Sequence, residues 1–517
     1  MPSAKSHDAR PTTPDSLYLG LDIGTTKVAA VVVDAATGAQ LAVESVAQAP
    51  PLPSAPGRSE WDAEGLIVAA LAAGRAAVAA SGRAGQIAAI GVTGQQHGGL
   101  LVCTAPGDAL RPLTPIIGWQ DKRCDEPAGG FPSSVEWMRA LTAGVPTEGT
   151  GCPLASGFLG ATLFWLARHG GLPTEPARAT FVPDYLVARL CDQPPVTDPT
   201  DAGGAGLFDA RAGDWHAEMI TALDLPPDLL PPVRPTGTIV GRLAPAAAAT
   251  LGLPAGVPVT NALGDNQASF FGSVGVAPDA LLVNVGTGGQ VSAIAPRFVR
   301  GDLLETRPYL AGGFLLVGGG IVGGRAYALL RDFIGQSGRD IFGVTAPDDL
   351  YARLNALAAA VPAGSDGLRC DPRFGGNRYD ASQRGAFIGL DTHNFTPGHF
   401  ARALLEGVAT TFHDLYATIR ATGLAPHTRL IGSGNGIRNN PLLAELLREA
   451  FGLPLVTPQH REEAAHGAAL LAAVAVGELT LADATGRLRY GAGARAKAQG
   501  SGQDMSSAAP RQRHTRR

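Results

Sequence analysis

The chain has 517 residues, enough for two or three domains with large hydrophobic cores. Its 41 Lys and Arg against 45 Asp and Glu leave a net charge of −4, which argues against nucleic acid or an anionic membrane as a partner. The five cysteines follow no disulfide or metal-binding spacing, and the longest apolar runs, such as residues 464–476, stop short of a bilayer span. Residues 1–16 lack the apolar core of a secretory signal and are expected to form a disordered leader. The few cysteines, odd in number, fit a reducing cytoplasm best.

The first predicted element is a β-hairpin over residues 17–34, LYLGLDIGTTKVAAVVVD. Alternating apolar residues lead into the turn, and a β-branched strand follows with no helix start signal. Gly24 permits close backbone approach, Thr25 and Thr26 supply amides and hydroxyls, and Lys27 adds positive charge, which together suit a phosphate. Many hairpins turn on Gly and Thr, so the segment alone also fits a purely structural turn.

A second hairpin of the same design lies in the other half of the chain, ALLVNVGTGGQVSAI at 280–294. Its turn contains Gly286, Thr287 and Gly288. Two hairpins of one design suggest a duplicated architecture in which both turns hold the same polyphosphate. Asp22, at the strand end beside the first turn, is then placed to hold Mg²⁺ directly or through water.

Between the hairpins, Asp62 caps an Ala-rich helix at 62–80, and a buried strand at 87–92 follows. That strand runs into TGQQHGG, which contains Gln96 and His97. A polar cluster at the carboxyl end of a strand in an α/β sheet faces the ligand crevice. The alternative for His97 is an ordinary loop histidine whose hydrogen bonds are satisfied.

The sequence PIIGWQDKRCDE carries Trp119, Gln120, Asp121 and Arg123. An indole to cover a sugar ring, with amide, carboxylate and guanidinium groups for its hydroxyls, is the usual chemistry of a polyol pocket. A Trp half buried under a surface ion pair explains the same residues.

A helix is predicted at 157–169, and residues 181–190 contain Asp184, which either faces a ligand or caps a helix. The polar stretch 197–204, TDPTDAGG, is expected to be an exposed loop. A strand at 257–262 then leads to Asp265 at a predicted helix start. Asp265 could cap that helix, but an acid where a strand meets a helix is also where a general base is positioned.

The second half continues with a glycine turn that precedes a helix in the segment 430–441, LIGSGNGIRNNP. Such a turn suits the adenosine and α-phosphate end of a nucleotide, although a plain strand-to-helix connection looks much the same. Residues 490–517 are expected to form a disordered basic tail. The other expected elements are a glycine-dense stretch at 312–321, helices at 325–333, 399–422, 442–451 and 462–476, and a Gly- and Arg-rich loop at 373–390 that leads into a strand.

Ten motifs in order resemble the FGGY family of carbohydrate kinases over nearly all of residues 17–485. They are DIGTTK, GVTGQQHG, GFLGATLFWL, TDPTDAGGAGLFD, LGDNQA, NVGTGG, RFGGNR before RGAFIGL, EGVATTFHDL, GSGNGIRNNP and EEAAHGAAL. Within the family, WQDKRC together with GFLGATLFWLARH resembles sedoheptulokinases more than xylulokinases or glycerol kinases. The chain departs from the family pattern at Thr162, where lysine is common, at Gly288, where serine is frequent, and at Ser433-Gly434-Asn435.

The resemblance implies an α/β fold of two RNase H-like domains around a central cleft, as in the sugar kinase, Hsp70 and actin superfamily. Residues 17–272 would form the sugar-binding domain and residues 273–489 the nucleotide-binding domain. The implied reaction is ATP-dependent phosphorylation of a ketose at its terminal primary hydroxyl, most closely sedoheptulose. Alternatives are a kinase for xylulose, another pentulose or a polyol, and an inactive nucleotide-dependent sugar sensor.

The resemblance also assigns roles to residues. Asp265 would be the general base and would contact the sugar, and Asp22 would serve Mg²⁺. The nucleotide contacts would be Gly24, Thr25, Thr26, Lys27, Gly286, Thr287, Gly288, Gly324, Gly432, Gly434 and Asn435. The other sugar contacts would be Gln96, His97, Trp119, Gln120, Asp121, Asp184 and Asn266. The expected partners are ATP, Mg²⁺ and a small sugar, with no nucleic acid or membrane and with a homodimer left open.

Overall fold

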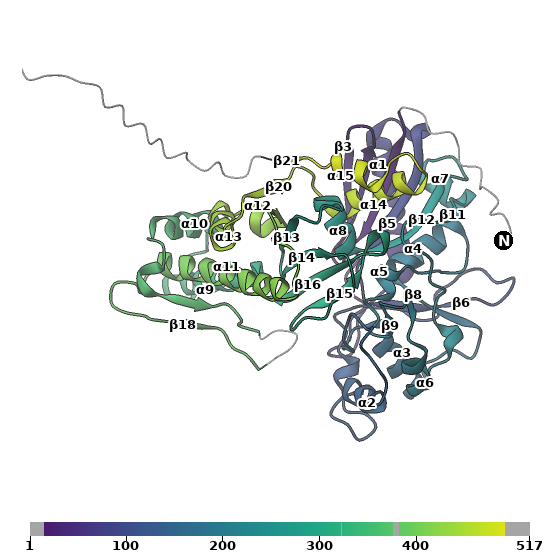
Figure 1. Ribbon diagram of the computed structural model, residues 1–517, viewed down its shortest axis with the longest axis horizontal. Helices are drawn as coiled ribbons and strands as arrows, with labels where there is room; N and C mark the ends of the chain where they lie inside the picture. The colour runs from purple at the N-terminus through teal and green to yellow at the C-terminus, as the bar shows by residue number, and fades with distance from the viewer. Residues whose placement is uncertain (1–14, 322, 376–381, 492–517) are drawn as a thin grey trace, which may run out of the picture.

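The computed structural model describes residues 15–321, 323–375 and 382–491 (Figure 1). The predicted leader therefore lies outside the described residues except for Asp15 and Ser16. Of the predicted tail, only the strand β21 (Tyr490–Gly491) is described.

A six-stranded sheet forms the centre of the N-terminal half, in the order β11-β12-β5-β1-β2-β3. The predicted hairpin is present, and its two strands with β3 form an antiparallel meander, while β5 and β12 run parallel to β1. The strands are β1 (Leu17–Ile23), β2 (Lys27–Asp34), β3 (Ala39–Ala47), β5 (Ile87–Gly94), β11 (Ile239–Arg242) and β12 (Pro258–Gly264). The parallel strands β1, β5 and β12 direct their carboxyl ends to the same edge.

A seven-stranded sheet repeats this pattern in the C-terminal half, in the order β15-β16-β14-β13-β19-β20-β21. The second hairpin and β16 form an antiparallel meander, and β19 and β20 run parallel to β13. The strands are β13 (Ala280–Val285), β14 (Gly289–Ala295), β15 (Glu305–Pro308), β16 (Phe314–Ile321), β19 (Arg429–Ser433) and β20 (Leu455–Pro458). The predicted duplication of a two-domain α/β fold is thus confirmed.

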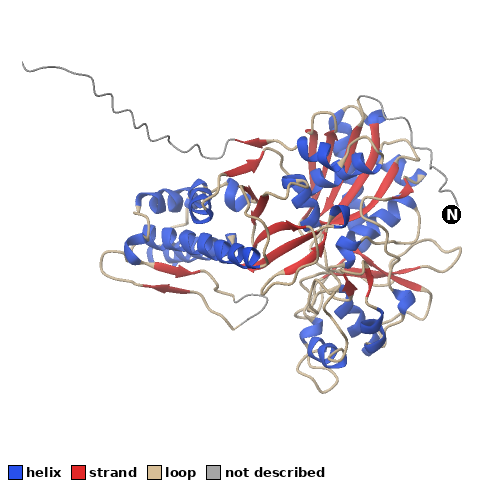
Figure 2. Ribbon diagram, viewed as in Figure 1, coloured by secondary structure: helices blue, strands red, loops and turns tan. Residues whose placement is uncertain are grey.

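Two helices lie between the sheets, α8 (Asp265–Val274) and α14 (Glu463–Ala475), and they pack against each other (Figure 2). They cross at glycines: a Cβ on Gly272 would lie 2.0 Å from the carbonyl oxygen of Glu463, and one on Gly467 would lie 2.1 Å from that of Ala268. α14 also packs on β1 and β5. Through α14, the second half therefore packs directly on the first sheet.

The outer faces of the sheets are covered by further helices. On the first sheet these are α1 (Ala63–Ser81), α4 (Val182–Cys191) and α7 (Pro245–Leu251). The second half carries α9 (Gly324–Phe342), α10 (Leu350–Ala360), α11 (Pro397–Ala421), α12 (Asn435–Arg438) and α13 (Pro441–Phe451), with a small hairpin of β17 (Arg369–Asp371) and β18 (Ala386–Ile388), while α15 (Leu481–Gly486) packs on α14. Asp62 caps α1 as predicted, because its carboxylate accepts hydrogen bonds from the amides of Glu64 and Gly65.

A separate lobe of the N-terminal half holds a four-stranded sheet, β4-β7-β6-β8. Its elements are β4 (Glu60–Trp61), β6 (Gly99–Cys103), β7 (Ile116–Ile117), β8 (Ala177–Phe181), α2 (Ser134–Leu141) and α3 (Leu159–Arg168), with α5 (Pro199–Ala202), β9 (Phe208–Asp209), β10 (Asp214–Trp215) and α6 (Ala217–Ala222) nearby. This lobe lies below the six-stranded sheet in Figure 1 and brings the Trp119 segment toward the junction of the two halves.

One local prediction is wrong, and one of the two alternatives for Asp184 is excluded. The stretch 197–204 is buried and contains α5, because Asp198 accepts hydrogen bonds from the amides of Thr200 and Asp201 and from the Thr200 hydroxyl, which satisfies these polar groups internally. Asp184 caps no helix, since α4 has Phe181 at its N-cap and Asp184 lies buried in the first turn. The predicted helix at 325–333 also continues to Phe342.

By length and composition alone, α1 is the one helix among the described residues that could cross a bilayer. From the sequence, every apolar run is expected to be too short for this. One such helix is weak evidence for a membrane protein. Leu66, Ile67 and Ala70 on this helix belong to the core that covers β2 and β3.

Candidate active site

A cavity of about 440 Å³ lies at the junction of the two halves. Its walls include the ends of β1, β13 and β14 and the starts of α8 and α14. The lining residues central to its chemistry are Asp22, Gly24, Asp265, Asn266, Asn284 and Arg307. Gly24 and Asp265, which the sequence analysis placed in one site, thus share one cavity with a residue of the second hairpin.

Asp22 is the second-last residue of β1 and lies next to the first turn. Burial raises its pKa to about 7, and the negative charges of Asp265 and Glu462 add to that increase. A carboxyl group surrounded by other carboxylates is stabilised in its ionised form by a cation. Asp22 therefore fits as one carboxylate ligand of a divalent metal ion whose other ligands come from a polyphosphate and water, since no three Asp, Glu, His or Cys side chains among the described residues are grouped to hold a metal ion.

Asp265 is the first residue of α8, directly after β12. Its Oδ1 accepts a hydrogen bond of 2.7 Å from the amide of Asn266. Burial raises the pKa of Asp265 to about 6, while the positive charge of Arg307 and the Asn266 amide act in the opposite direction. A carboxylate with a pKa close to neutrality, held on a rigid helix start in a cavity, is suited to accept a proton from a hydroxyl group.

The second turn is fixed by the start of α9. The amide of Gly324 donates to the carbonyl oxygen of Gly286 at 2.9 Å, and that of Arg325 donates to Thr287 at 3.1 Å. Gly434, at the start of α12, has φ 84°, and a Cβ there would lie 2.4 Å from the carbonyl oxygen of Val285. The predicted nucleotide contacts Gly286, Thr287, Gly324 and Gly434 therefore form one packed group around the end of β13.

On the sugar side, His97 lines the cavity with a positive φ of 78° and stacks on Phe158 with ring centroids 4.1 Å apart. Its Nδ1 donates to the carbonyl oxygen of Gly204 at 2.8 Å, which fixes the orientation of the ring. Trp119 is 43% exposed at the cavity, and its Nε1 donates to the Thr25 hydroxyl at 3.2 Å. The indole thus connects the predicted sugar site to the first turn.

Comparison with known proteins decides the family. The N-terminal domain of the FGGY family of carbohydrate kinases matches residues 17–272, and the C-terminal domain of that family matches residues 281–476. A glycerol kinase of Trichlorobacter lovleyi is 31% identical over 490 residues, covering 89% of this chain and 90% of that protein. The chain belongs to the FGGY family of carbohydrate kinases.

Other FGGY relatives carry different names. A sedoheptulokinase of Mus musculus is 27% identical over 496 residues, covering 90% of this chain and 97% of that protein. The crystal structure of xylulose kinase from Rhodospirillum rubrum matches with a TM-score of 0.81 at 28% identity, covering 92% of this chain and 93% of that one. The predicted family and fold are confirmed, and the protein is an ATP-dependent carbohydrate kinase. These three FGGY relatives are named for three different acceptors.

The structure does not bring every predicted site residue of this FGGY kinase into the cavity. Asp121 is buried, and its oxygens accept hydrogen bonds from the Ser59 amide and from the amide and guanidinium of Arg123. Gln120 is exposed beside it, and Asp184 is fully buried within α4. None of the three is among the residues that line the cavity. Their assignment to the sugar stays a prediction, and for Asp121 the ion-pair alternative describes the contacts that are present.

The remaining predicted nucleotide residues differ in their exposure and in their contacts. Lys27 forms an ion pair with Glu462, and Thr26 is exposed. Gly432 is buried within β19, and Asn435 is exposed at the start of α12. Gly288 accepts a hydrogen bond from the Gly286 amide within the second turn. Their contacts with a nucleotide stay predictions.

Several cavity residues escaped the sequence analysis. Glu462 and Glu463 at the start of α14 lie in the motif EEAAHGAAL, which indicated the family but gave no role to its acids. Gln290 follows the second turn, and Arg307 lies on β15. Arg307 gave no signal, because an arginine two residues after a glutamate reads as an ordinary local ion pair.

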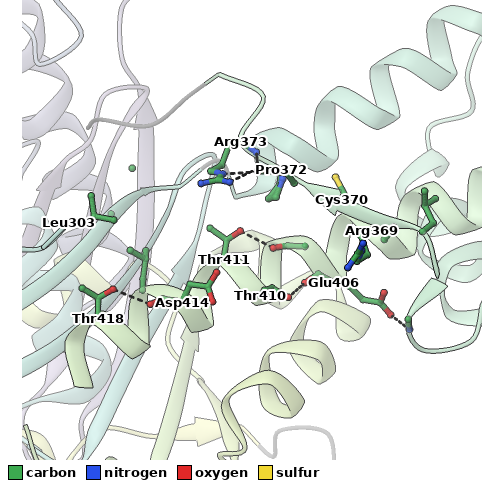
Figure 3. Close-up of a pocket in the computed structure, with 18 residues that line it drawn as sticks. Leu303, Arg369, Cys370, Pro372, Arg373, Glu406, Thr410, Thr411, Asp414 and Thr418 are labelled. Carbon is green, nitrogen blue, oxygen red and sulfur yellow. Dashed lines mark hydrogen bonds and ion pairs between the residues drawn. The ribbon is translucent and has the colours of Figure 1, made fainter. Parts of the chain in front are cut away.

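A second cavity of about 500 Å³ lies wholly in the C-terminal half, between α11, β17 and β16 (Figure 3). Arg373 lines it, and its Nε and Nη2 donate to Asp371 at 2.8 and 2.6 Å. The cavity adjoins the catalytic one, because a Cβ on Gly319 in its wall would lie 3.9 Å from the Cβ of Gln290. It contains none of the predicted site residues.

Proposed function

We propose that the protein transfers the γ-phosphoryl group of ATP to the terminal primary hydroxyl of a ketose, with Asp265 as the general base. The observation that carries this proposal is the shared cavity, in which Asp265 and Asn266 lie with Gly24 of the first turn and Asn284 of the second hairpin. Two glycine turns suit the phosphates, and a carboxylate with a raised pKa suits the attacking hydroxyl.

In this mechanism the protein mainly positions the reactants. The first and second turns hold the β- and γ-phosphates through backbone amides and the hydroxyls of Thr25 and Thr287, and Asp265 accepts the proton of the sugar hydroxyl as its oxygen attacks the phosphorus in line. The proton therefore ends on Asp265, and ADP leaves. Trp119, which already contacts Thr25, covers the sugar and excludes water from the attacking site.

Asp22 would hold Mg²⁺, either directly or through water, with Glu462 and Glu463 contributing to the negative field. When bound, Mg²⁺ would neutralise charge on the phosphates of ATP. The role of this chain is to place Asp22 at the end of a buried strand, beside the phosphate turn and facing the same cavity as the base.

Sedoheptulose, with sedoheptulose 7-phosphate as product, is the acceptor that we propose. The sequences WQDKRC and GFLGATLFWLARH resemble sedoheptulokinases, and relatives named sedoheptulokinase match this chain over nearly its whole length. In the structure these two segments meet, since Ser156, just before the second segment, donates to the carbonyl oxygen of Asp121 in the first at 3.2 Å. The two segments that support the sugar assignment thus lie in contact, and Trp119 belongs to the first of them.

Xylulose or another pentulose is the second candidate. It is favoured by the match of the whole chain to the xylulose kinase of Rhodospirillum rubrum, at a TM-score of 0.81. Glycerol is a third acceptor to test, because several relatives with 30–32% identity are named glycerol kinase.

A phosphorylation screen with purified protein and Mg-ATP tests the proposal. ADP release is measured with sedoheptulose, D-xylulose, D-ribulose and glycerol, and the product is identified by ³¹P and ¹³C NMR. The proposal predicts the highest kcat/KM for sedoheptulose, with the phosphate on the terminal primary carbon. A higher kcat/KM for xylulose or glycerol rejects the sedoheptulose assignment, and no sugar-dependent ADP release above background rejects transfer altogether.

A further inference from the structure

The guanidinium of Arg307 is a cavity group without an assigned role. It comes from β15 of the C-terminal half, is only 6% exposed, and lines the cavity with Asp265 and Asn266. Its Nε and Nη2 donate to Oε2 of Glu305 at 2.8 and 2.6 Å, and its Nη1 donates to Oε1 of Gln96 at 2.8 Å. These bonds leave N–H groups of the guanidinium unused in a side chain that faces the catalytic cavity.

Gln96 is the partner that holds Arg307 in place from the N-terminal half. Its Nε2 donates to the carbonyl oxygen of Thr200 at 2.8 Å and to Oε1 of Gln267 at 3.0 Å, while its Oε1 accepts from Arg307. Both amide hydrogens of Gln96 are therefore already used within the protein. Gln96 thus acts on a ligand through Arg307 more readily than by donating a hydrogen bond itself.

The charge of Arg307 is balanced before any ligand arrives. Glu305 is buried beside it, with 4% of its side chain exposed, and the two charges form a tight pair. A guanidinium neutralised in this way is better suited to donate hydrogen bonds to neutral hydroxyls than to attract a further anion. Asn266 lines the same cavity, and its side-chain oxygen and nitrogen are both buried with no hydrogen-bond partner.

An unpartnered buried amide and a guanidinium with unused donors in one cavity are groups that the hydroxyls of an open-chain sugar would satisfy. We propose that Arg307 is a sugar-binding residue, supplied to the sugar site by the C-terminal half, and that Gln96 and Glu305 are the positioning residues that orient it. The proposal rests on the proposed function only in taking a sugar as the acceptor. It adds a contact by which the bound sugar joins the two halves of the molecule.

Arg307→Met and Arg307→Lys test the role by steady-state kinetics with sedoheptulose and Mg-ATP. Loss of hydrogen bonds from a charged group to a neutral ligand is expected to raise KM for the sugar by about 10- to 100-fold in Arg307→Met, with KM for ATP changed by less than about twofold. Arg307→Lys should recover part of the loss, because one ammonium replaces one of the donors. An unchanged sugar KM in Arg307→Met overturns the proposal.

Removing only one charge of a buried pair can destabilise the fold, so the double variant Glu305→Gln/Arg307→Met is made in parallel. It is expected to unfold at a temperature close to that of the wild type and to keep the raised sugar KM. Equal increases in the KM for sugar and for ATP in the double variant would indicate general disruption and overturn the proposal. A loss confined to kcat would mean that the guanidinium acts on the phosphoryl group or through the pKa of Asp265, and it would also overturn the proposal.

Arg373 provides a matched control. Like Arg307, Arg373 lies two residues after its carboxylate partner, Asp371, and donates to it through Nε and Nη2. Arg373 lines the second cavity instead of the first (Figure 3). Arg373→Met is expected to leave the sugar KM within about twofold of the wild-type value. If the wild type phosphorylates no sugar, the proposed function fails whatever the variants do; if it does and Arg307→Met behaves like Arg373→Met, only the present inference fails.

Discussion

The two halves of the molecule use one scaffold but treat their acidic groups differently. Asp22 at the end of β1 corresponds to Asn284 at the end of β13, and Asp265 at the start of α8 corresponds to Glu463 at the start of α14. In the C-terminal half, the first of these two positions is neutral, because it is Asn284. The second is an acid with a cationic partner, because Glu463 forms an ion pair with Arg438. In the N-terminal half both acids face the cavity with raised pKa values.

This difference indicates which half carries the chemistry. A buried carboxylate without a cationic partner costs stability, so it is expected to persist where function requires it. The C-terminal half, by contrast, offers backbone amides and glycines that approach closely, as at Gly434 against Val285. On the proposed function, the duplicated fold divides the work: the N-terminal half supplies the acids Asp22 and Asp265 for a metal and a proton, and the C-terminal half supplies backbone amides and closely packed glycines for the nucleotide.

The largest expected effect comes from neutralising the base. Asp265→Asn keeps the shape of the side chain and removes the proton acceptor, so kcat should fall by about 10²- to 10⁴-fold while ADP still binds. Stopped-flow or coupled-assay kinetics with a parallel measurement of ADP binding check this. Asp214→Asn, at an exposed acid outside the cavity, is the control. Near-normal turnover in Asp265→Asn would remove Asp265 from the role.

The same variant has an expected signature in stability. Because burial raises the pKa of Asp265 to about 6, the folded protein binds that proton more tightly than the unfolded chain does, and the ionised carboxylate costs stability as pH rises from about 4 through 6. Asp265→Asn should therefore unfold at a higher temperature than the wild type at pH 8, by a few degrees, and the difference should shrink at pH 4. Thermal scans at both pH values measure it.

The next largest effect is expected at the metal position. Asp22→Asn makes the first hairpin resemble the second at this site, and the Mg²⁺ concentration needed for half-maximal activity should rise by about 10- to 100-fold. The matched variant Asn284→Asp adds a carboxylate to the second hairpin and should not restore activity in the Asp22→Asn background, because Asn284 lies at the end of β13 and not at the end of β1. Restoration would show that the two turns are interchangeable.

Much of this division could be predicted from the sequence. Both hairpins and Asp265 were found, because strand alternation, glycine turns and a strand-to-helix junction are local signals that survive folding. Arg307 was not found, since its importance depends on contact with Gln96, which is far away in sequence. The burial of residues 197–204 was missed for the same reason: the polar groups are satisfied by Asp198 and by the strand end at Gly264, which composition does not reveal.

A smaller effect is expected from pH. The base must be ionised to accept a proton, so at saturating Mg²⁺ kcat/KM should fall about tenfold per unit below a pKa of about 6 and level off above it. Rates measured from pH 4.5 to 8.5 with viscosity controls test this. A profile that stays flat down to pH 5 would mean that the carboxylate titrates at the ordinary value of an exposed aspartate and would contradict the burial argument.

The smallest effect is expected at Glu463, and it is the sharpest test of the comparison because this residue occupies the position that corresponds to Asp265. Its charge is already met by Arg438, so Glu463→Gln removes little that the reaction uses, and kcat should stay within about threefold of the wild type. Arg438→Met should cost more, since it leaves Glu463 unpaired near Asp22 and raises the pKa of Asp22 further. If Glu463→Gln instead matches the loss seen in Asp265→Asn, both helix starts carry essential acids and the division of labour between the halves is wrong.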